Sequence, residues 1–234
     1  MSVLIAYMYT ATQKYIPWGR TFEEYLSMFS LSDIDLSGSI LGCSDGPSSF
    51  NCELTQRGGN IVSIDSLYRY TSQQIRKLID QTYPDAIQSF HYKKSLFIWK
   101  HLRSVHALGR MRLTAMNDFL ADLEWGKMEG RYLEGALPII PLTDQNFDLA
   151  VCSHFLFTNT AHMTTNYHVN SIKEMTRVAN EVRIFPLLEN GAVLSRHLLP
   201  TISTLRDDGY KVRLEKVSYE FLPGGNQMLR VTAK

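Results

Sequence analysis

The first clear pattern along the chain is a pair of short apolar runs separated by a polar loop that contains glycines. Ile40 and Leu41 open the first run, and the second run covers 61–64. Short apolar runs bounded by turn-forming residues are typical of buried strands in a parallel sheet. The pattern predicts a strand, a glycine loop, a helix, a turn and a second strand, with Asp65 at the tip of the second strand.

The end of the chain has a different pattern, in which apolar and polar residues alternate. The alternation covers 211–217 and 227–231, and the sequence Pro223-Gly224-Gly225 lies between them. Alternating stretches that flank turn-forming residues are typical of a β-hairpin. We therefore expect an antiparallel hairpin at the C-terminus.

Helical spacing predicts an N-terminal helix within 15–32. Thr21 can cap this helix, and Glu24 stands three positions later, where it completes a capping box. The expected buried stripe consists of Phe22, Leu26 and Phe29.

A second helical region covers 68–128. We expect a first helix that begins at Thr71 or Ser72 and ends near Thr82, because Pro84 should stop it. A longer helix should follow, with apolar residues three and four positions apart and a gap around Arg112. These apolar residues are Leu102, Val105, Leu108, Met116, Phe119, Leu120 and Leu123.

The same region is basic. It holds ten Lys or Arg and five Asp or Glu, a net charge of +5 in a chain whose total is +1. The apolar stripe indicates packing against the sheet, and the charged face is compatible with a cap over a substrate. A basic cap would favour an anionic substrate.

The glycine loop points to a ligand. Gly42 and Gly46 allow a tight turn and a close approach of the backbone, and the next helix presents its N-terminal amides there. Asp65 is placed to accept hydrogen bonds from two ribose hydroxyls. A dinucleotide loop would need glycine at the positions of Ser44 and Pro47, so the pattern favours another nucleoside cofactor.

The loop resembles motif I of class I S-adenosylmethionine-dependent methyltransferases, with Ser44 in place of the second glycine and Ile40 where an acidic residue is usual. Further stretches resemble later parts of that family's fold. They are a short third strand near 131–134, a fourth strand at 146–154 opened by Phe147-Asp148, a helix at 171–178 and a fifth strand at 181–188. The resemblance spans 15–234, and the set of motifs is similar to that of a bacterial group without an assigned substrate.

The resemblance implies an α/β fold: a doubly wound, mostly parallel seven-stranded sheet with a C-terminal antiparallel hairpin and a helical insertion, 68–128, after the second strand. It implies one methyltransferase-like domain over 1–234, in which 15–32 forms a lid helix and 68–128 is the candidate acceptor cap. The implied cofactor is S-adenosyl-L-methionine, and the product is S-adenosyl-L-homocysteine. The implied cofactor-binding residues are Arg20, Gly42, Cys43, Ser44, Gly46, Asp65, Ser66 and Ser153.

Two of the candidate residues have competing interpretations. Arg20 could pair with the methionine carboxylate of the cofactor, or it could be a solvated surface residue. His154, at the end of the fourth strand, is the candidate general base, and the alternative is that it only shapes the pocket. His162 and His168 follow in a Thr/Asn-rich loop, 158–170, but their spacing without carboxylates does not favour a metal site.

Composition, the length of the apolar runs and the cysteine count indicate the cellular compartment. A chain of 234 residues that is 44% hydrophobic can bury one large core, and no apolar run reaches the roughly 20 residues of a membrane span. The run at 3–8 is too short for a secretory signal, so we expect a cytoplasmic protein. The three cysteines, Cys43, Cys52 and Cys152, fit reduced buried thiols.

Three functions remain open at this point. The first is methyl transfer to a small molecule, mainly by proximity and orientation of the reactants. The second is methyl transfer to RNA or protein, although the net charge marks no nucleic-acid surface and no Asn-Pro-Pro-Tyr run follows the fourth strand. The third is cofactor binding without transferase activity. The sequence leaves the acceptor, its reacting atom and the oligomeric state open.

Overall fold

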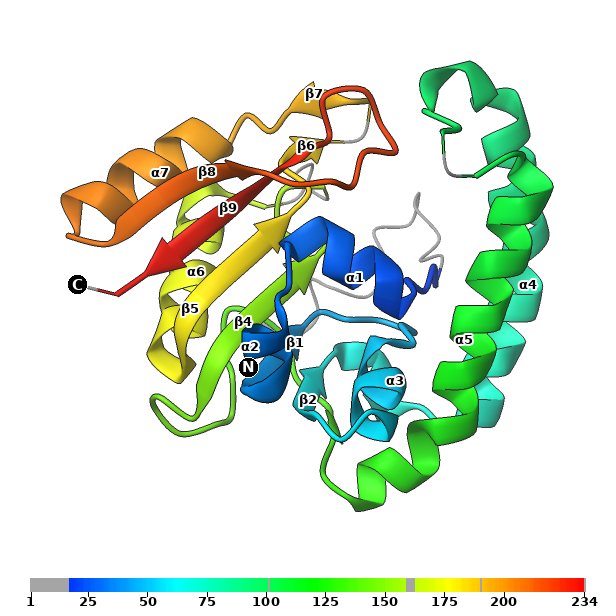
Figure 1. Ribbon diagram of the computed structural model, residues 1–234, viewed down its shortest axis with the longest axis horizontal. Helices are drawn as coiled ribbons and strands as arrows, with labels where there is room; N and C mark the ends of the chain where they lie inside the picture. Colours follow the sequence, from blue (N-terminus) through cyan, green and yellow to red (C-terminus); the bar gives the residue numbers. More distant parts are fainter. Residues whose placement is uncertain (1–16, 101, 159–162, 190, 234) are drawn as a thin grey trace.

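The computed structural model of the chain describes residues 17–100, 102–158, 163–189 and 191–233. Among these residues, seven strands form one sheet in the order β3-β2-β1-β4-β5-β9-β8 (Figure 1). Strands β1 to β5 run parallel, and β9 is antiparallel to both β5 and β8. The predicted sheet is confirmed. Its strands are β1 (Ser39–Cys43), β2 (Asn60–Ile64), β3 (Tyr132–Leu133), β4 (Phe147–Ser153), β5 (Ala179–Phe185), β8 (Lys211–Lys216) and β9 (Gln227–Thr232).

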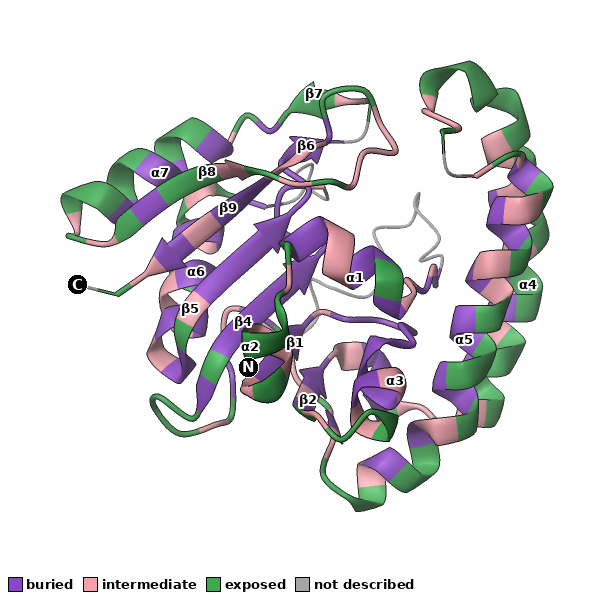
Figure 2. Cartoon of the chain, viewed as in Figure 1, coloured by how far each residue is buried: buried purple, intermediate pink, exposed green. Residues whose placement is uncertain are grey.

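Helices cover both faces of the sheet, because successive strand residues point to opposite faces. Ile40 and Leu149 face one core cluster with α1 and α3, whereas Leu41 and Ala150 face another with α6 and α7. Figure 2 shows the central strands buried and the outer helix faces exposed. The helices are α1 (Phe22–Phe29), α2 (Asp33–Ser37), α3 (Phe50–Gln56), α6 (Thr165–Val178) and α7 (Leu198–Asp207).

The helical insertion after β2 is a long hairpin that stands beside the sheet (Figure 1). Thr71 caps its first helix through a capping box with Gln74, as one of the two predicted caps. The prediction that Pro84 ends this helix is wrong, because the helix continues through Pro84 to Tyr92. After β2 the chain forms η1 (Ser66–Arg69), whose end enters the insertion, and the insertion continues with α4 (Ser72–Tyr92), η2 (Lys94–Leu96) and α5 (Val105–Met128).

Close packing of α4 on α5 explains why the proline is tolerated. Ile79, Thr82 and Ala86 on either side of Pro84 are buried. A Cβ on Gly109 of α5 would lie 2.4 Å from the Tyr83 hydroxyl, so the two helices are in close contact here. Most helix stability in proteins comes from such packing, and it outweighs the hydrogen bond that proline removes.

Several element boundaries differ from the predictions. Helix α6 begins at Thr165, so His168 lies in a helix and not in the predicted loop. Strand β5 ends at Phe185, before Pro186, and Leu188 starts a short ribbon of β6 (Leu188–Glu189) and β7 (Val193–Leu194).

The stripes of two helices also differ in part. On α1, Leu26 is only half-buried, whereas Tyr25 and Met28 are fully buried. In the insertion, Leu102 precedes the first residue of α5. Within the described residues, no helix is long and apolar enough to cross a membrane.

Candidate functional site

The ends of the central parallel strands bring the predicted site residues to one edge of the sheet. Strand β1 lies between β2 and β4, with Cys43 in register with both Ile64 and Cys152. The residues that end or follow these strands therefore lie together at the carboxyl edge, where ligands bind open α/β sheets. They include Ser44, Gly46, Asp65, Ser66, Ser153 and His154.

The glycine loop has two residues in the left-handed region of φ and is held by a neighbouring carboxylate. Ser44 and Gly46 have positive φ angles of 55° and 58°. Asp65 fastens the loop from the neighbouring strand, since its carboxylate accepts hydrogen bonds from the Gly46 amide at 2.9 Å and the Leu67 amide at 2.7 Å. Burial raises the pKa of Asp65, and these two amides oppose the shift. The predicted strand-tip carboxylate thus also shapes the loop.

Asp45 is a buried carboxylate of the glycine loop that was not among the predicted site residues. It accepts hydrogen bonds from the Tyr25 hydroxyl at 2.7 Å and the Ser63 hydroxyl at 2.6 Å. Burial raises its pKa to about 6, although both hydroxyls favour the ionised form. A Cβ on Gly42 would lie 1.9 Å from Asp45 Oδ2. Gly42 is therefore required by the Asp45 side chain, so a larger residue there would disturb the fold as well as any ligand.

The segment 17–20 forms a strap that runs between the loop and the insertion. The Arg20 carbonyl accepts hydrogen bonds from Ser48 Oγ and the Ser49 amide, both at 3.0 Å. A Cβ on Gly19 would lie 2.2 Å from the Pro47 carbonyl oxygen, so only glycine fits at this position of the strap. The N-terminal segment is thus fastened to the glycine loop by its backbone.

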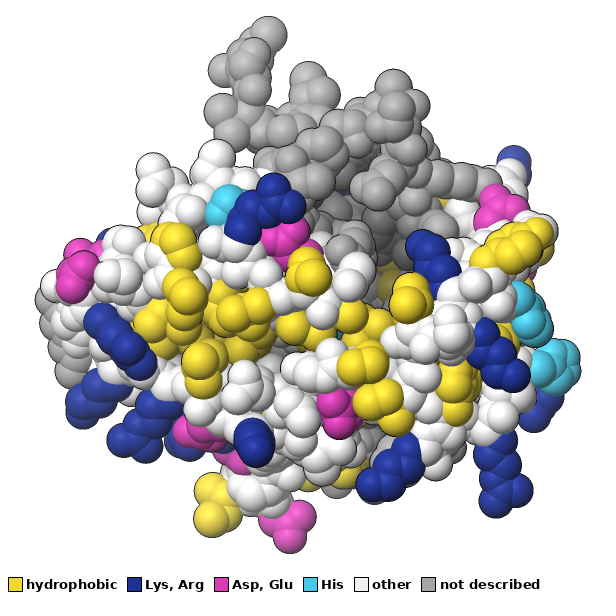
Figure 3. All heavy atoms as spheres, turned by 90° about the horizontal axis from the view of Figure 1, so that it is seen from above, with side chains coloured by type: hydrophobic (Ala, Val, Ile, Leu, Met, Phe, Trp, Pro, Cys, Tyr) yellow, Lys and Arg dark blue, Asp and Glu magenta, His cyan; other side chains and the backbone are white. Residues whose placement is uncertain are grey.

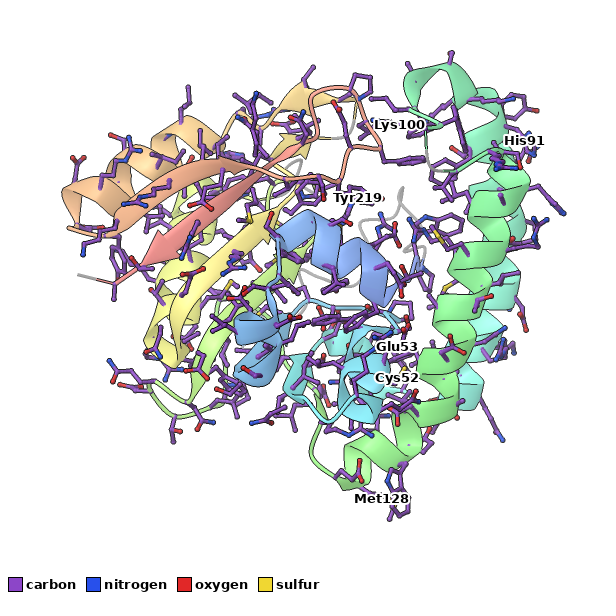
Figure 4. All side chains as sticks on the ribbon, viewed as in Figure 1. Cys52, Glu53, His91, Lys100, Met128 and Tyr219 are labelled. Atoms are coloured by element: carbon purple, nitrogen blue, oxygen red, sulfur yellow. The ribbon has the colours of Figure 1, made fainter. Side chains whose placement is uncertain are left out.

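Below the strap, a buried ion pair joins α1 to the insertion. Arg112 of α5 and Glu24 of α1 are 1% and 8% exposed and are linked by two hydrogen bonds. The Glu24 carboxylate also accepts a hydrogen bond from the Tyr219 hydroxyl at 2.8 Å, and Figure 4 shows Tyr219 beside α1. The predicted capping box of Thr21 and Glu24 is confirmed.

This ion pair explains the gap in the apolar stripe of α5. In the sequence, the ion pair was indicated only by Arg112, the charged residue that interrupts the stripe. The remaining positions Leu108, Met116 and Phe119 are buried as predicted.

Arg20 is the second cation at this site. Its Nη1 donates to the Trp18 carbonyl at 3.1 Å, and its buried Nε has no hydrogen-bond partner among the described residues. Burial and the nearby charge of Arg112 lower its pKa to about 10, with Glu24 as the opposing carboxylate. Among the described residues, Glu24 is therefore the carboxylate that faces both guanidinium groups.

His154 lies beside these cations at the end of β4. Its Nδ1 is 2.9 Å from Ser153 Oγ, and its backbone amide donates to the Phe185 carbonyl at 2.7 Å. Burial, together with the charges of Arg20 and Arg112, lowers the pKa of His154 well below its ordinary value. The imidazole is therefore neutral at pH 7.

The candidate residues that remain are Cys43, His168 and His162. The Cys43 thiol is buried in the core and burial raises its pKa, so only its backbone faces the loop. His168 lies on α6 with both ring nitrogens beside backbone carbonyls, at 2.8 Å from Thr164 and 2.7 Å from Leu156. His162 lies outside the described residues.

Similarity to solved structures is recognisable but distant. The magnesium protoporphyrin IX methyltransferase of Synechocystis PCC 6803, crystallised with SAM, is 12% identical, with 86% of this chain and 73% of that chain covered and a TM-score of 0.45. A SAM-dependent methyltransferase from Aquifex aeolicus is 16% identical, with coverages of 89% and 90% and a TM-score of 0.41. These similarities are too weak to carry a function to this chain.

Sequence similarity identifies a much nearer relative. No protein-family model matches the chain. The uncharacterized protein MJ0045 of Methanocaldococcus jannaschii is 30% identical over 214 residues, which cover 90% of this chain and 93% of the relative. The chain has the strand order expected for the class I methyltransferase fold, and it belongs to the same protein family as MJ0045.

Proposed function

We propose that the chain is an S-adenosylmethionine-dependent methyltransferase that acts on a small molecule. The observation that carries this proposal is the carboxyl edge of the sheet, where Asp65 lies 2.9 Å from the amide of Gly46 in the glycine loop. The strand-tip carboxylate and the loop stand where a nucleoside cofactor binds in sheets of this kind.

The residues at this edge fit the cofactor. Each Asp65 oxygen accepts one backbone amide, and an ionised carboxylate offers about four acceptor positions, so two remain for the ribose hydroxyls. The Arg20 guanidinium, whose buried Nε has no hydrogen-bond partner among the described residues, suits the methionine carboxylate. Besides Asp65 and Arg20, the proposed cofactor site includes Gly42, Cys43, Ser44, Ser66 and Ser153.

Methyl transfer requires little chemistry from the protein. When bound, S-adenosylmethionine supplies an activated methyl group to the acceptor atom and leaves as S-adenosylhomocysteine. The strap, α1 and the insertion would hold the acceptor in line and keep water away, and such positioning can contribute roughly 7–11 kcal/mol. His154 Nε2 would take the proton that the acceptor loses, while Nδ1 keeps its contact with Ser153.

Calorimetric titration with S-adenosylmethionine tests the cofactor site. Asp65→Ala should weaken binding at least tenfold, because each lost bond to a charged group is worth about 1.5–3 kcal/mol. Asp148→Ala is the matched control, since Asp148 also accepts a backbone amide, at 2.8 Å from Ser39, but stands at the opposite edge of the sheet. Equal affinities for the wild type and a folded Asp65→Ala variant would overturn the assignment.

Transfer is tested with radiolabelled S-adenosylmethionine and a cell extract. Label in small molecules supports the proposal, label in RNA or protein supports a polymer methyltransferase, and binding without transfer indicates a protein that only binds the cofactor.

His154→Gln should slow transfer by about 10²–10⁴-fold if the residue is the general base, while cofactor affinity is retained. Because burial lowers the pKa of His154, wild-type activity should be lost only well below pH 6.5. An unchanged pH profile in the variant would limit His154 to shaping the pocket.

A further inference from the structure

An aromatic cluster brings together three segments that are distant in the sequence. Trp18 of the strap stacks on Phe90 with ring centroids 5.3 Å apart, and Phe97 of the insertion stacks on Phe221 of the β8–β9 connection at 4.7 Å. Phe90 and Phe97 are 5.0 Å apart and join the two pairs. The cluster consists of Trp18, Tyr83, Phe90, Phe97, Trp99 and Phe221.

The cluster adjoins the proposed methyl-transfer site. Arg20 is tied to Trp18 through its hydrogen bond to the Trp18 carbonyl. Phe221 lies two residues after Tyr219, which donates to Glu24. The insertion is fastened here as well, since the Ile98 amide donates to the Phe221 carbonyl at 2.8 Å. The strap and the insertion thus supply buried cations as well as aromatic rings, and the β8–β9 connection supplies Phe221 together with the Tyr219 hydroxyl.

The rings are not closed into a core. All six residues of the cluster are only partly buried, in contrast to the fully buried aromatic residues of α1 and α3. Phe97 and Trp99 also line a hollow of about 490 Å³ together with Lys94. Seen from above, hydrophobic side chains form a band across the molecule, and basic side chains lie mostly around its rim (Figure 3).

From this arrangement we infer that the methyl acceptor is a planar aromatic or conjugated ring compound that stacks on the aromatic cluster. The inference rests on the proposed function and names its substrate class. Aromatic rings prefer stacked or edge-to-face partners with centroids 4.5–7 Å apart, as the rings of the cluster have with one another. Because all six residues are partly exposed, a further planar ring can add to the cluster in the same way. An aliphatic acceptor would gain only from apolar contact and not from stacking.

The test compares two carboxylic acids that differ in planarity. Binding of 2-naphthoate and of its saturated counterpart, decahydro-2-naphthoate, is measured by calorimetry on the full chain with saturating S-adenosylhomocysteine. We expect 2-naphthoate to bind at least tenfold more tightly. Equal binding of the two acids, or no binding of either, would overturn the inference, and this comparison needs no variant.

A matched pair of variants locates the binding. Phe97→Leu should weaken 2-naphthoate binding at least fivefold, whereas Trp125→Leu should leave it within twofold, because Trp125 lies on the same insertion but is 62% exposed and outside both the cluster and the hollow. Equal effects of the two substitutions would contradict a site in the cluster. S-adenosylhomocysteine affinity is measured on the same samples. A wild-type chain that does not bind S-adenosylhomocysteine would count against the proposed function, whereas a wild-type chain that binds it without preferring the planar acid would count against this inference only.

Discussion

Two buried carboxylates at the carboxyl edge of the sheet have opposite electrostatic surroundings. Glu24 faces Arg112 and Tyr219, and although burial alone would raise its pKa, the charge and hydrogen bonds of Arg112 lower it to about 2. Among the described residues, Asp45 accepts hydrogen bonds from the hydroxyls of Tyr25 and Ser63, and burial, together with the nearby charge of Asp65, raises its pKa to about 6. Hydrogen bonds from neutral groups do not compensate for burial of a charge as a guanidinium does.

The comparison assigns different tasks to the two regions. Glu24 holds together α1, the insertion and the β8–β9 connection, so it joins the parts that would enclose an acceptor. Asp45 joins the glycine loop to β2 through Ser63 and to α1 through Tyr25, by hydrogen bonds from neutral hydroxyls. The first region should therefore respond to loss of a partner, and the second should respond to pH.

Removal of the Arg112 guanidinium should have the largest effect on the free energy of unfolding. Arg112→Met leaves the Glu24 charge buried without its main partner, and breaking such a pair costs about 3–5 kcal/mol. The free energy of unfolding in urea measures this loss. The double variant Glu24→Gln/Arg112→Met should recover much of it, because no unpaired carboxylate remains.

An exposed ion pair provides the control for this experiment. Lys173 and Asp208 are 2.7 Å apart, with side chains 38% and 41% exposed. Lys173→Met should change the unfolding free energy by less than about 1 kcal/mol. If the two single variants lose equal stability, the buried pair does not hold the segments together.

The second effect concerns pH and Asp45. The folded protein holds the Asp45 proton more tightly than the unfolded chain, so this residue makes stability fall as the pH rises from about 4 to about 6. The shift corresponds to up to about 3 kcal/mol. In Asp45→Asn this decline should disappear, which urea unfolding between pH 4 and 6.5 would show.

Asp148→Asn is the matched carboxylate control. Hydrogen bonds from Ser39 lower the pKa of Asp148, so its contribution is lost only below its ordinary pKa. The difference between this variant and the wild type should stay flat between pH 4 and 6.5. A flat difference for Asp45→Asn as well would show that Asp45 ionises normally.

The smallest expected effect is a difference in pH dependence between Tyr25, which donates to Asp45, and Tyr219, which donates to Glu24. At pH 7 both carboxylates are ionised, and Tyr25→Phe and Tyr219→Phe should each cost about 1.5–3 kcal/mol. At pH 5 Asp45 is protonated and Glu24 is not, so the cost of Tyr25→Phe should fall roughly by half, towards that of a neutral hydrogen bond. The cost of Tyr219→Phe should stay constant. Parallel changes in the two variants would contradict the different pKa values.

Much of the fold was predictable because its signals are local. The apolar runs at 40–41 and 61–64, the alternating C-terminal stretches and the capping box of Thr21 each depend on residues a few positions apart. The glycine loop and Asp65 could be placed together because parallel strands end at the same edge of a sheet. Their contact with a cofactor stays a prediction.

The sequence by itself determined the order of strands and helices, the position of the loop and the strand-tip carboxylate. Only the tertiary structure decided that α4 continues through Pro84, that Arg112 is buried against a carboxylate 88 positions away, and that Asp45 lies beneath two hydroxyls. Periodicity and caps act within a few residues, whereas burial of a charge depends on which distant segments pack around it. The aromatic cluster belongs to this second group, because its rings come from three segments that meet only in the folded chain.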